Sequence, residues 1–573
     1  MLDAIVSTVK KYQRKNKFLN RQLKLFKKWY GSRTDGHPDW SKLLSRDSEI
    51  WNAALINSKQ GPKILIATSV GQYFSGTTLE SVLSVGLLLR GAEIHVLLCD
   101  SFLPACLACE YTWYPNESKF ADNGPQRDIC KHCFQPARKT FEEIGAKVHR
   151  YNDYVSKDEL NEADRLSTTI SYDAIPDYVL DGCAVGEHAL AGALRFYGRC
   201  TLDEEPNADK ILRRYFKAAL LTKYAMHRLF DEQEFQSVVF HHGIYVPQGV
   251  IGEVARQKKL RVVNWNPAYR KQCFIFSHTD TYHHTLMAEP VDRWEELEWT
   301  PRIEYNLDNY LKSRWMGSQD WIWFHERPNF DLTAIANEIG IDFSKPTIGL
   351  LTNVLWDAQL HYPANAFKNM SEWVLQTISY FSSRPEVNLL IRVHPAEIHG
   401  ALIARQSIVE EIHRVFPELP KNIFVVPPES HVSTYVAMSK CDSVIIYGTK
   451  TGVELTTAGI PVIVAGEAWI RNKGITFDVL SPDQYFDLLD RLPLKERMNN
   501  AKIHRARKYA YHFFFRRMIP LKFLAPTKRN PPYRVNINSL QELLPGRSEG
   551  LDVICNGILN GTDFIYPAER LEQ

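Results

Sequence analysis

The sequence lacks several features that would place it in a specialised class of protein. No stretch approaches the ~18 consecutive apolar residues that a transmembrane helix needs. The N-terminus has no apolar core of the kind found in secretory signals. No internal repeat of fixed period and no low-complexity segment is present. Together these absences predict a globular protein of the cytoplasm.

Cysteine and net charge are also scarce. Ten cysteines in 573 residues do not make a disulfide scaffold, and a net charge of +3 says little about partners. A hydrophobic content of 45% and a charged content of 24% are ordinary for a globular fold. A chain of this length exceeds a single core and is expected to form about two to four domains.

The positive charge is concentrated near the N-terminus. Between Met1 and Gly36, ten Lys or Arg residues stand against Asp3 and Asp35 alone. Residues 1–58 are therefore predicted to form a basic helical extension. It either rests on the main body, solvated, or lies at the inner face of the membrane, where each exposed basic residue adds about 1 kcal/mol of attraction to anionic headgroups.

From residue 61 onward, short β-branched runs alternate with amphipathic segments. Lys63–Thr68 predicts a buried strand, Leu79–Arg90 a helix and Glu93–Asp100 a second strand, which is the order of a parallel β-α-β unit. The fold class is therefore α/β, with two Rossmann-like doubly wound domains. Further strands are predicted at Lys147–Tyr151, Ser237–His241, Arg261–Trp265, Thr347–Thr352, Asn388–His394, Asn422–Val426, Asp442–Tyr447 and Pro461–Ala465.

The alternation divides the chain into four segments. The extension at 1–58 is followed by one Rossmann-like domain at 59–335, a second at 336–495 and C-terminal helices with a tail at 496–573. Ligands of such sheets bind beyond the carboxyl ends of the strands, so the cleft between the two halves is the expected site.

The residues after one strand of the second domain are suited to bind phosphate. The sequence RVHPAE at 392–397 places Arg392, His394 and Glu397 directly after a predicted strand. A guanidinium is a rigid fork of donors, and histidine donates or accepts near neutral pH. The alternative interpretation is a loop salt bridge involving Glu397.

A second polar loop, YGTKTGVE at 447–454, follows another predicted strand. Its glycine lets the backbone approach a ligand, its Thr and Lys side chains offer donors to a phosphate, and its Glu can accept two ribose hydroxyls. The spacing of a Walker loop is absent, and a plain strand-to-helix turn with Lys450 in solvent is the alternative. The predicted donor-binding residues here are Gly448, Thr449, Lys450, Thr451 and Glu454.

The run from Ser439 to Gly466, with YGTKTGVELTTAGIPVIVAG, resembles the nucleotide-sugar-binding half of GT-B glycosyltransferases. It is most similar to the bacterial capsule and surface polysaccharide biosynthesis group, which includes the Kdo transferases, and RVHPAE is similar to the His-Pro motif of that group. The resemblance implies an acceptor domain at 59–335, a nucleotide-sugar domain at 336–495 and last helices that cross back onto the first domain. The group usually has a small hydroxyl residue where this chain has Lys450. The donor-site residues so implied are Arg392, His394, Thr449, Lys450 and Glu454.

An inverting transferase needs a carboxylate or histidine to take the proton of the acceptor. Glu187, near the start of a predicted helix, and His242, after a predicted strand, are the candidates. Arg195 follows Glu187 by eight residues, about two helical turns along the same face. A retaining enzyme would need no protein base in this sense.

Four cysteines form the strongest local pattern. Cys106 and Cys109 make one C-x2-C pair and Cys130 and Cys133 a second, within residues 104–134. This spacing predicts four thiolates around one tetrahedral structural ion, with zinc favoured over an iron–sulfur cluster. His132 is not expected to be a ligand.

These observations lead to one main hypothesis and two alternatives. The main one is transfer of a sugar from a nucleotide sugar to a carbohydrate or lipid-linked acceptor in surface or capsular polysaccharide biosynthesis. A nucleotide-sugar 2-epimerase of the same fold needs no acceptor pocket. A zinc-ribbon protein that binds nucleic acid ranks last, because only Lys119 and Arg127 are basic between the cysteine pairs.

Overall fold

The computed structural model divides the chain into two compact units. Unit 1 consists of residues 38–197, 202–265 and 520–563, and unit 2 of residues 198–201, 266–519 and 564–571. The described residues are 38–114, 116–316, 319–321, 328–357, 363–400, 402–494, 496–527 and 532–571.

The core of unit 1 is a parallel sheet in which strands run in the order β5-β4-β1-β2-β3. From β1 the chain adds β2 and β3 on one side and β4 and β5 on the other, so the winding reverses between β1 and β4. The strands are β1 (Lys63–Ser69), β2 (Glu93–Leu98), β3 (Lys147–Arg150), β4 (Ser237–His241) and β5 (Arg261–Pro267), with an antiparallel pair of β14 (Leu524–Pro526) and β15 (Tyr533–Val535).

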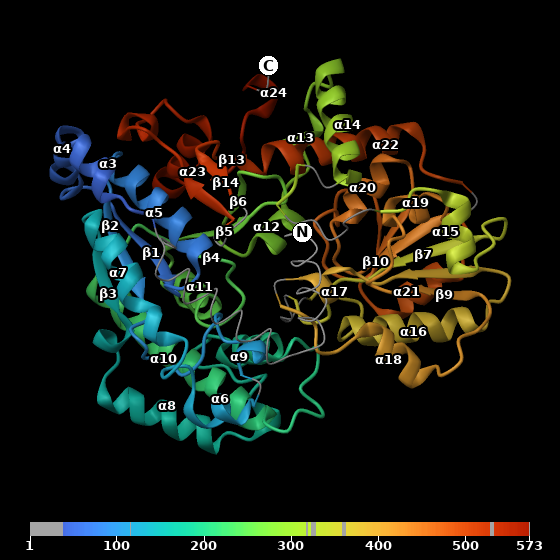
Figure 1. Cartoon of the computed structure of the whole chain (residues 1–573), viewed down its shortest axis with the longest axis horizontal. Helices are drawn as coiled ribbons and strands as arrows, with labels where there is room; N and C mark the ends of the chain where they lie inside the picture. The colour runs from blue at the N-terminus through green and yellow to red at the C-terminus, as the bar shows by residue number, and fades with distance from the viewer. Residues whose placement is uncertain are drawn as a thin grey trace, which may run out of the picture. The chain divides into compact units, whose positions relative to one another are not determined.

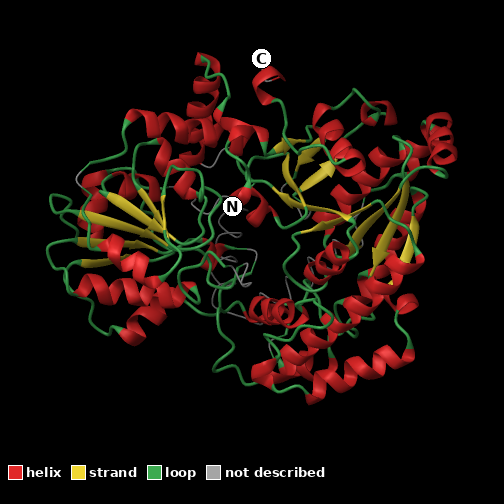
Figure 2. Ribbon diagram, turned by 180° about the vertical axis from the view of Figure 1, so that it is seen from behind, coloured by secondary structure: helices red, strands yellow, loops and turns green. Residues whose placement is uncertain are grey.

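Helices cover both faces of this sheet (Figures 1 and 2). Every residue of α5 is buried because the helix contacts β1 and β2 as well as α4, α7 and α23. A helix that is apolar on all sides belongs in such a position. The helices are α3 (Ser41–Arg46), α4 (Ser48–Ser58), α5 (Phe74–Leu88), α6 (Ser118–Asn123), α7 (Phe134–Glu143), α8 (Lys157–Thr169), α9 (Val185–Tyr197), α10 (Ala208–Glu232), α11 (Gln248–Gln257) and α23 (Glu549–Asn560), with short 3-10 turns at η1 (Tyr111–Trp113), η2 (Cys130–His132), η3 (Tyr151–Tyr154), η4 (Tyr172–Ala174) and η6 (Leu540–Leu543).

Unit 2 is built on a six-stranded parallel sheet of order β12-β11-β10-β7-β8-β9. Here too the winding reverses beside the first strand, between β7 and β10. The strands are β7 (Thr347–Leu351), β8 (Asn388–Arg392), β9 (Ile423–Val426), β10 (Ser443–Ile446), β11 (Val462–Val464) and β12 (Phe477–Asp478).

The helices of unit 2 again lie on two sides of the sheet (Figure 1), with α16 and α18 on one side and α15, α19 and α20 on the other. The apolar residues of α16 at Trp373, Val374 and Ile378 are buried at helical spacing against β8 and β9. Unit 2 contains β6 (Cys273–His278), α12 (Tyr282–Ala288), α13 (Asp292–Glu295), α14 (Pro301–Met316), α15 (Leu332–Ile339), α16 (Met370–Ser382), α17 (Ala396–His399), α18 (Ile408–Val415), α19 (Thr434–Ser439), α20 (Thr451–Thr457), α21 (Pro482–Leu489), α22 (Asn500–Tyr511), the π-helix η5 (His512–Arg516), β13 (Ile519–Pro520) and α24 (Ala568–Leu571).

Two Rossmann-like domains with parallel sheets are confirmed, and each long predicted strand is present within two residues of its predicted ends. The helix expected at Leu79–Arg90 instead begins at Phe74. Gly76 and Thr77 therefore lie in the first turn of α5. Strand β6 was not predicted.

Most of the predicted basic extension, residues 1–37, lies outside the described residues. Its remainder, residues 38–58, contains α3 and α4. Within the part of the chain that the structure describes, no helix has both the length and the apolar composition that crossing a membrane requires.

Candidate functional site

A cavity of about 280 Å³ lies at the carboxyl ends of the central strands of unit 2. The residues that follow β7, β8, β10 and β11 all contribute to its wall, so it occupies the point where the winding of the sheet reverses. Open α/β sheets bind ligands at this point. The lining residues are Tyr269, Tyr282, His283, Arg314, Asp320, Leu351, Thr352, Asn353, Val354, Asp357, Arg392, His394, Pro395, Ala396, Thr434, Tyr435, Gly448, Thr449, Lys450, Thr451 and Trp469.

A buried group of four charged side chains forms one part of this site. Arg314 Nε lies 3.0 Å from Glu454 Oε2, and Lys450 Nζ lies 3.5 Å from Glu454 Oε1. Arg314 also pairs with Asp320, whose other oxygen accepts a hydrogen bond of 2.9 Å from the Tyr310 hydroxyl. Two cations and two carboxylates thus balance one another at the cavity, and of the four only Glu454 does not line it.

The pKa of Glu454 and that of Lys450 are both lowered, which favours the charged form of Glu454 and the neutral form of Lys450. Burial raises the pKa of Glu454, but Arg314 and Lys450 outweigh burial, so the pKa is lowered overall. Burial and the nearby Arg314 lower the pKa of Lys450 to about 8. Lys450 therefore still carries its proton at neutral pH, and it lies 4.5 Å from the centre of the Tyr269 ring.

The loop before α20 contributes four of its predicted residues to the cavity wall, namely Gly448, Thr449, Lys450 and Thr451. A Cβ at Gly448 would lie 3.0 Å from the carbonyl oxygen of Glu467, which is closer than ordinary contacts allow. Thr449 Oγ1 donates to Thr451 Oγ1 over 3.2 Å, so the two hydroxyls are held next to each other. Glu454 does not line the cavity, because it is held below by Arg314 and Lys450.

Arg392 lines the cavity, but most of its donors already have partners. Its guanidinium donates to the carbonyl oxygens of Val393 (3.0 Å), Pro427 (2.6 Å) and Ser430 (3.1 Å). Its Nε–H, in contrast, is buried without a hydrogen-bond partner among the described residues. Burial lowers the pKa of Arg392 to about 10, which leaves it cationic at neutral pH. Arg392 thus fixes the loop after β9, and its Nε–H is the donor for which the described residues provide no partner.

The other two residues of RVHPAE are placed differently. His394 lines the cavity, and its Nδ1 accepts a hydrogen bond of 3.0 Å from the Ala396 backbone N–H. Its neutral ring therefore carries the proton on Nε2. Glu397 lies outside the lining, where it accepts from the Ile408 backbone N–H over 3.3 Å, and burial raises its pKa to about 7. The structure does not pair Glu397 with Arg392.

Several lining residues were missed by the sequence analysis. Arg314 lies in α14, and Asp320 follows that helix. Tyr282, His283 and Trp469 supply aromatic rings. No ligand-binding role was predicted for segment 300–340. Its aromatic and charged residues were the signal available, but their distance in sequence from 447–454 hid the pairing of Arg314 with Glu454.

The two predicted base residues belong to unit 1. Glu187 lies half-buried in the first turn of α9. His242 follows β4 with a positive φ of 66°, and its ring centre lies 5.1 Å from that of Tyr245. Removal from water, together with His241, lowers the pKa of His242 well below its usual value. Arg195 donates to the Leu107 carbonyl oxygen over 2.7 Å.

The winding of unit 1 reverses where β1 and β4 end, and buried polar groups gather there. Tyr73, after β1, has its hydroxyl 3.4 Å from Nε2 of His241 at the end of β4. The Trp265 indole donates to Glu80 Oε1 over 2.9 Å. Burial raises the pKa of Glu80 to about 7 and also raises the pKa of Tyr73. These groups are therefore held in or near their neutral forms.

The four predicted metal ligands make two tight turns. The Cys109 backbone N–H donates to the Cys106 carbonyl oxygen (2.9 Å), and that of Cys133 donates to Cys130 (3.1 Å). Burial raises the pKa of the Cys109 and Cys130 thiols. Among the described residues, which include all four cysteines, no three His, Cys, Asp or Glu side chains are arranged to hold a metal ion. The predicted four-cysteine metal site is thus not confirmed.

No family model matches the chain, and no curated protein matches it. Among solved structures, it is similar to the β-Kdo 2,4 transferase KpsC of Thermosulfurimonas dismutans, with 13% identity over 48% of this chain and 79% of that chain and a TM-score of 0.31. It is also similar to the glycotransferase of kitacinnamycin (11% identity; 79% and 95% covered; TM-score 0.21). A third similar structure is the UDP-GlcNAc 2-epimerase of Neisseria meningitidis bound to UDP-GlcNAc. It shares 10% identity over 78% of this chain and 95% of that chain, with a TM-score of 0.22.

Proposed function

We propose that the protein is a glycosyltransferase that binds a nucleotide sugar in the cavity of unit 2 and transfers the sugar to a carbohydrate or lipid-linked acceptor of surface polysaccharide. The observation that carries the proposal is the position of the cavity. It lies where the winding of a parallel sheet reverses and is lined by both motifs through which the sequence resembles GT-B enzymes.

The chemistry of the lining supports an anionic ligand. Lys450 is a charged amine at neutral pH, Thr449 and Thr451 add hydroxyl donors, and the Arg392 Nε–H is a buried donor without a described partner. Leaving a buried donor unpaired costs about 1–3 kcal/mol, so a ligand oxygen that accepts from it gains that amount. Phosphate oxygens are such acceptors.

Catalysis would then come from position and charge. As the bond between sugar and nucleotide breaks, negative charge grows on the leaving phosphate, and Lys450 stabilises it without rearrangement because Glu454 and Tyr269 already hold the ammonium. In an inverting reaction a residue of unit 1, Glu187 or His242, takes the acceptor proton. The depressed pKa of His242 keeps its ring neutral at neutral pH but also makes it a weaker base than an ordinary imidazole.

A thermal-shift panel of UDP-, GDP-, CMP- and dTDP-sugars tests the binding half of the proposal. A ligand at about 100 times its Kd stabilises the protein by about 2.7 kcal/mol. One donor class should stabilise the wild type and lose its effect in Lys450→Met and Thr449→Val. Lys345→Met, at an exposed lysine just before β7, is the matched control and should respond like the wild type. The absence of stabilisation by every donor would refute the proposal.

Product analysis separates transfer from epimerisation. The active donor class is incubated with the protein alone and then with candidate saccharide acceptors. Transfer predicts no change to the donor sugar without acceptor and a new glycoside with it. An epimer of the donor sugar formed without acceptor would make the protein an epimerase of the same fold.

A structural zinc ion at Cys106, Cys109, Cys130 and Cys133 remains a separate part of the proposal. The two C-x2-C pairs and the tight turn within each support it. Elemental analysis of protein purified without chelators should find one zinc per chain, lost in Cys106→Ser and Cys130→Ser but kept in Cys200→Ser, which changes a cysteine outside the pairs. Wild-type protein that contains neither zinc nor iron would end this part of the proposal.

A further inference from the structure

One buried histidine of unit 1 joins the two segments that carry the candidate bases. His188 lies in the first turn of α9, directly after Glu187, and is 3% exposed. Its Nδ1 lies 2.6 Å from the carbonyl oxygen of Ile244, which follows His242 by two residues in the loop between β4 and α11. A carbonyl oxygen only accepts, so the Nδ1–H is the donor. This hydrogen bond connects the first turn of α9 to the loop.

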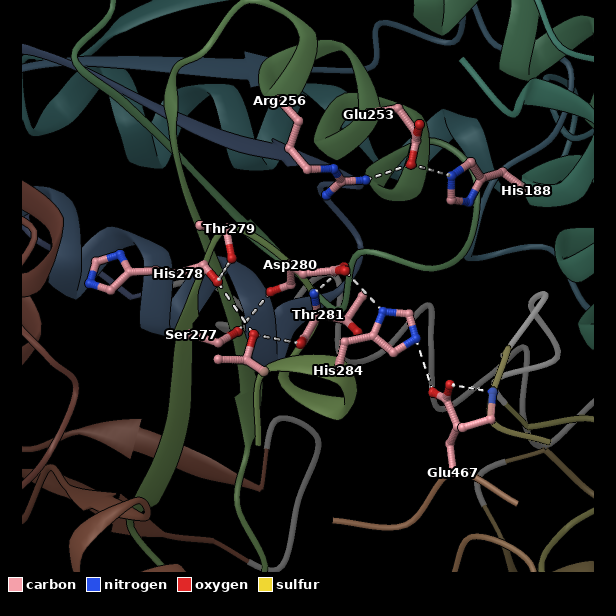
Figure 3. Close-up of polar contacts among 12 residues, drawn as sticks. His188, Glu253, Arg256, Ser277, His278, Thr279, Asp280, Thr281, His284 and Glu467 are labelled. Atoms are coloured by element: carbon pink, nitrogen blue, oxygen red, sulfur yellow. Dashed lines mark hydrogen bonds and ion pairs between the residues drawn. The ribbon is translucent and has the colours of Figure 1, made fainter. Parts of the chain in front are cut away.

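A carboxylate faces the other nitrogen of the same ring. Glu253 Oε1, on α11, lies 3.9 Å from His188 Nε2 and 2.6 Å from Arg256 Nη2 (Figure 3). Burial raises the pKa of Glu253, but His188 and Arg256 outweigh burial, so the pKa is lowered overall. The distance of 3.9 Å is too long for a hydrogen bond, and Glu253 therefore acts on the ring through its charge. Each ring nitrogen thus faces a different partner, and a ring turned over by a half-turn would lose both contacts.

Helix α11 leaves no space beside this hydrogen bond. A Cβ at Gly249 would lie 2.2 Å from His188 Nδ1 and 2.5 Å from the Ile244 carbonyl oxygen. Carbon atoms in van der Waals contact keep about 3.5–4.0 Å between them, so only glycine fits here. The Gly249 backbone N–H also donates to the Tyr245 carbonyl oxygen over 2.9 Å, which joins the loop to the start of α11. The bond between His188 and Ile244 is therefore enclosed, where a hydrogen bond is stronger than in water.

The same helix holds the loop at a second point. Arg195 follows His188 by seven residues, about two helical turns, and its guanidinium carbon lies 5.4 Å from the centre of the Tyr245 ring. The Tyr245 ring centre lies in turn 5.1 Å from that of His242. His242 has a left-handed backbone, with a φ of 66°, and such a conformation persists in a residue other than glycine only where the surrounding structure fixes it. Helix α9 supplies two of the contacts that fix it.

A base acts only within about 3 Å of the proton that it takes, and a misplacement of about 1 Å costs on the order of 100-fold in rate. We infer that His188 is a positioning residue for the proposed transfer, because its Nδ1–H holds the loop of His242 and the helical turn of Glu187 in one arrangement. His188 acts through the loop, since the Ile244 carbonyl oxygen already uses its Nδ1–H. This inference rests on the proposed function.

The kinetics of three variants at His188 test the inference, with the donor and acceptor that the product analysis identifies. His188→Phe keeps a ring but has no donor, so kcat should fall on the order of 100-fold while KM for the nucleotide sugar stays within about twofold. His188→Asn places an amide N–H near the position of Nδ1 and should recover most of the rate. His188→Gln places its amide near Nε2 instead and should not.

A second measurement needs no substrate. Deuterium exchange at the ring carbon between the two nitrogens, followed by mass spectrometry, gives the pKa of each histidine. In the wild type, burial and His241 lower the pKa of His242 well below its ordinary value of 6.5. In His188→Phe the loop is released and the pKa of His242 should rise toward 6.5, whereas in His188→Asn it should match the wild type.

His95→Phe is the matched control. His95, on β2 of the same unit, is 1% exposed and likewise lies between a hydrogen-bond partner, His149 (2.7 Å), and a carboxylate, Glu93 (3.2 Å). Its replacement should lower the melting temperature but leave kcat and the pKa of His242 unchanged, because it has no contact with the loop.

Full kcat in folded His188→Phe, or a His242 pKa that does not change there, would overturn the inference and leave the proposed function standing. If His188→Phe does not fold, equal kcat values in His188→Asn and His188→Gln would overturn it in the same way. A wild type that transfers no sugar from any of the nucleotide sugars would overturn both.

Discussion

The two units share one topology and differ in the electrostatics of the point where their sheets reverse winding. In unit 1, Glu80 has a pKa raised to about 7, Tyr73 a raised pKa and His242 a strongly lowered one, so each shift favours the neutral form. In unit 2, the pKa of Glu454 is lowered and that of Arg314 is raised, so both stay charged.

This difference arises because the buried polar groups of the two units have different charged neighbours. In unit 1 removal from water is the largest influence on Glu80, Tyr73 and His242, and it suppresses their ionisation. In unit 2 the attraction between buried cations and carboxylates outweighs desolvation at Glu454 and Arg314, whereas desolvation prevails at Lys450. The same strand arrangement therefore offers neutral hydrogen-bonding and proton-accepting groups in one unit and fixed charge in the other. Under the proposed function, the first suits an uncharged acceptor, and the second suits an anionic leaving group.

The largest effect is expected when a side chain is added at Gly448, where the backbone itself lines the cavity of unit 2. Gly448→Val adds a Cβ 3.0 Å from the Glu467 carbonyl oxygen, so the loop or its neighbour must move. Nucleotide affinity should fall by about 100-fold or more, measured by calorimetry, because the displaced loop carries Thr449 and Lys450. Gly340→Asn, at a left-handed position with no atom within 4 Å of the added Cβ, should bind normally. Normal binding by both variants would remove this loop from the site.

The charge of unit 2 should appear in the pH dependence of binding. Lys450 has a pKa of about 8, and an anionic ligand favours its protonated form. Affinity should be level below pH 7 and fall about tenfold per pH unit well above pH 8, because one proton must then be taken up on binding. Lys450→Met should be weaker and show no such fall. A wild-type profile that stays level to pH 9.5 would show that Lys450 is not used.

The neutral character of unit 1 should appear in its stability. The pKa of Glu80 is raised by burial from 4.5 to about 7 in the folded protein, so its contribution to the free energy of unfolding is full below pH 4.5 and is lost as pH rises through 7. Glu80→Gln keeps an acceptor for the Trp265 indole and never ionises. It should match the wild type at pH 4.5 and be more stable by roughly 1–3 kcal/mol at pH 8, measured by denaturant unfolding. Equal stability at both values would show that Glu80 ionises freely.

The smallest effect is expected at His284. Burial lowers its pKa, but Asp280 and Glu467 outweigh burial and raise it from 6.5 to about 10. The raised pKa contributes stability that is full below pH 6.5 and lost as pH rises through 10. The stability difference between wild type and His284→Gln should therefore shrink by about 1–2 kcal/mol from pH 6 to pH 10. A difference that is constant over this range would mean that His284 is neutral in the folded protein.

Sequence patterns predicted the parallel strands and the loops after β8 and β10 because both depend on local order along the chain. A β-branched run such as Lys63–Thr68 fixes its own strand. The partners of those loops could not be predicted in the same way. Arg314 meets Glu454 across 140 residues of sequence, and Trp469 meets His283 across 186. Such pairings depend on how helices and loops pack on the sheet.

The same limit applies to the contacts of Glu454 and Arg392. A glutamate in the first turn of α20 suggested a ribose ligand, but the structure surrounds Glu454 with Arg314, Lys450 and Tyr435. Arg392 suggested a phosphate ligand, but its guanidinium chiefly holds the carbonyl oxygens of Pro427 and Ser430. In both cases the contacts of the residue could be read only from the fold.

The most direct test of the central claim is the equilibrium binding of the preferred nucleotide sugar to wild type, Lys450→Met and His242→Gln, measured by calorimetry and combined with transfer rates. Binding should be lost in Lys450→Met and unchanged in His242→Gln, and transfer should fall in both. Full nucleotide-sugar affinity in Lys450→Met, or loss of binding in His242→Gln alone, would contradict a donor site in the charged cavity of unit 2.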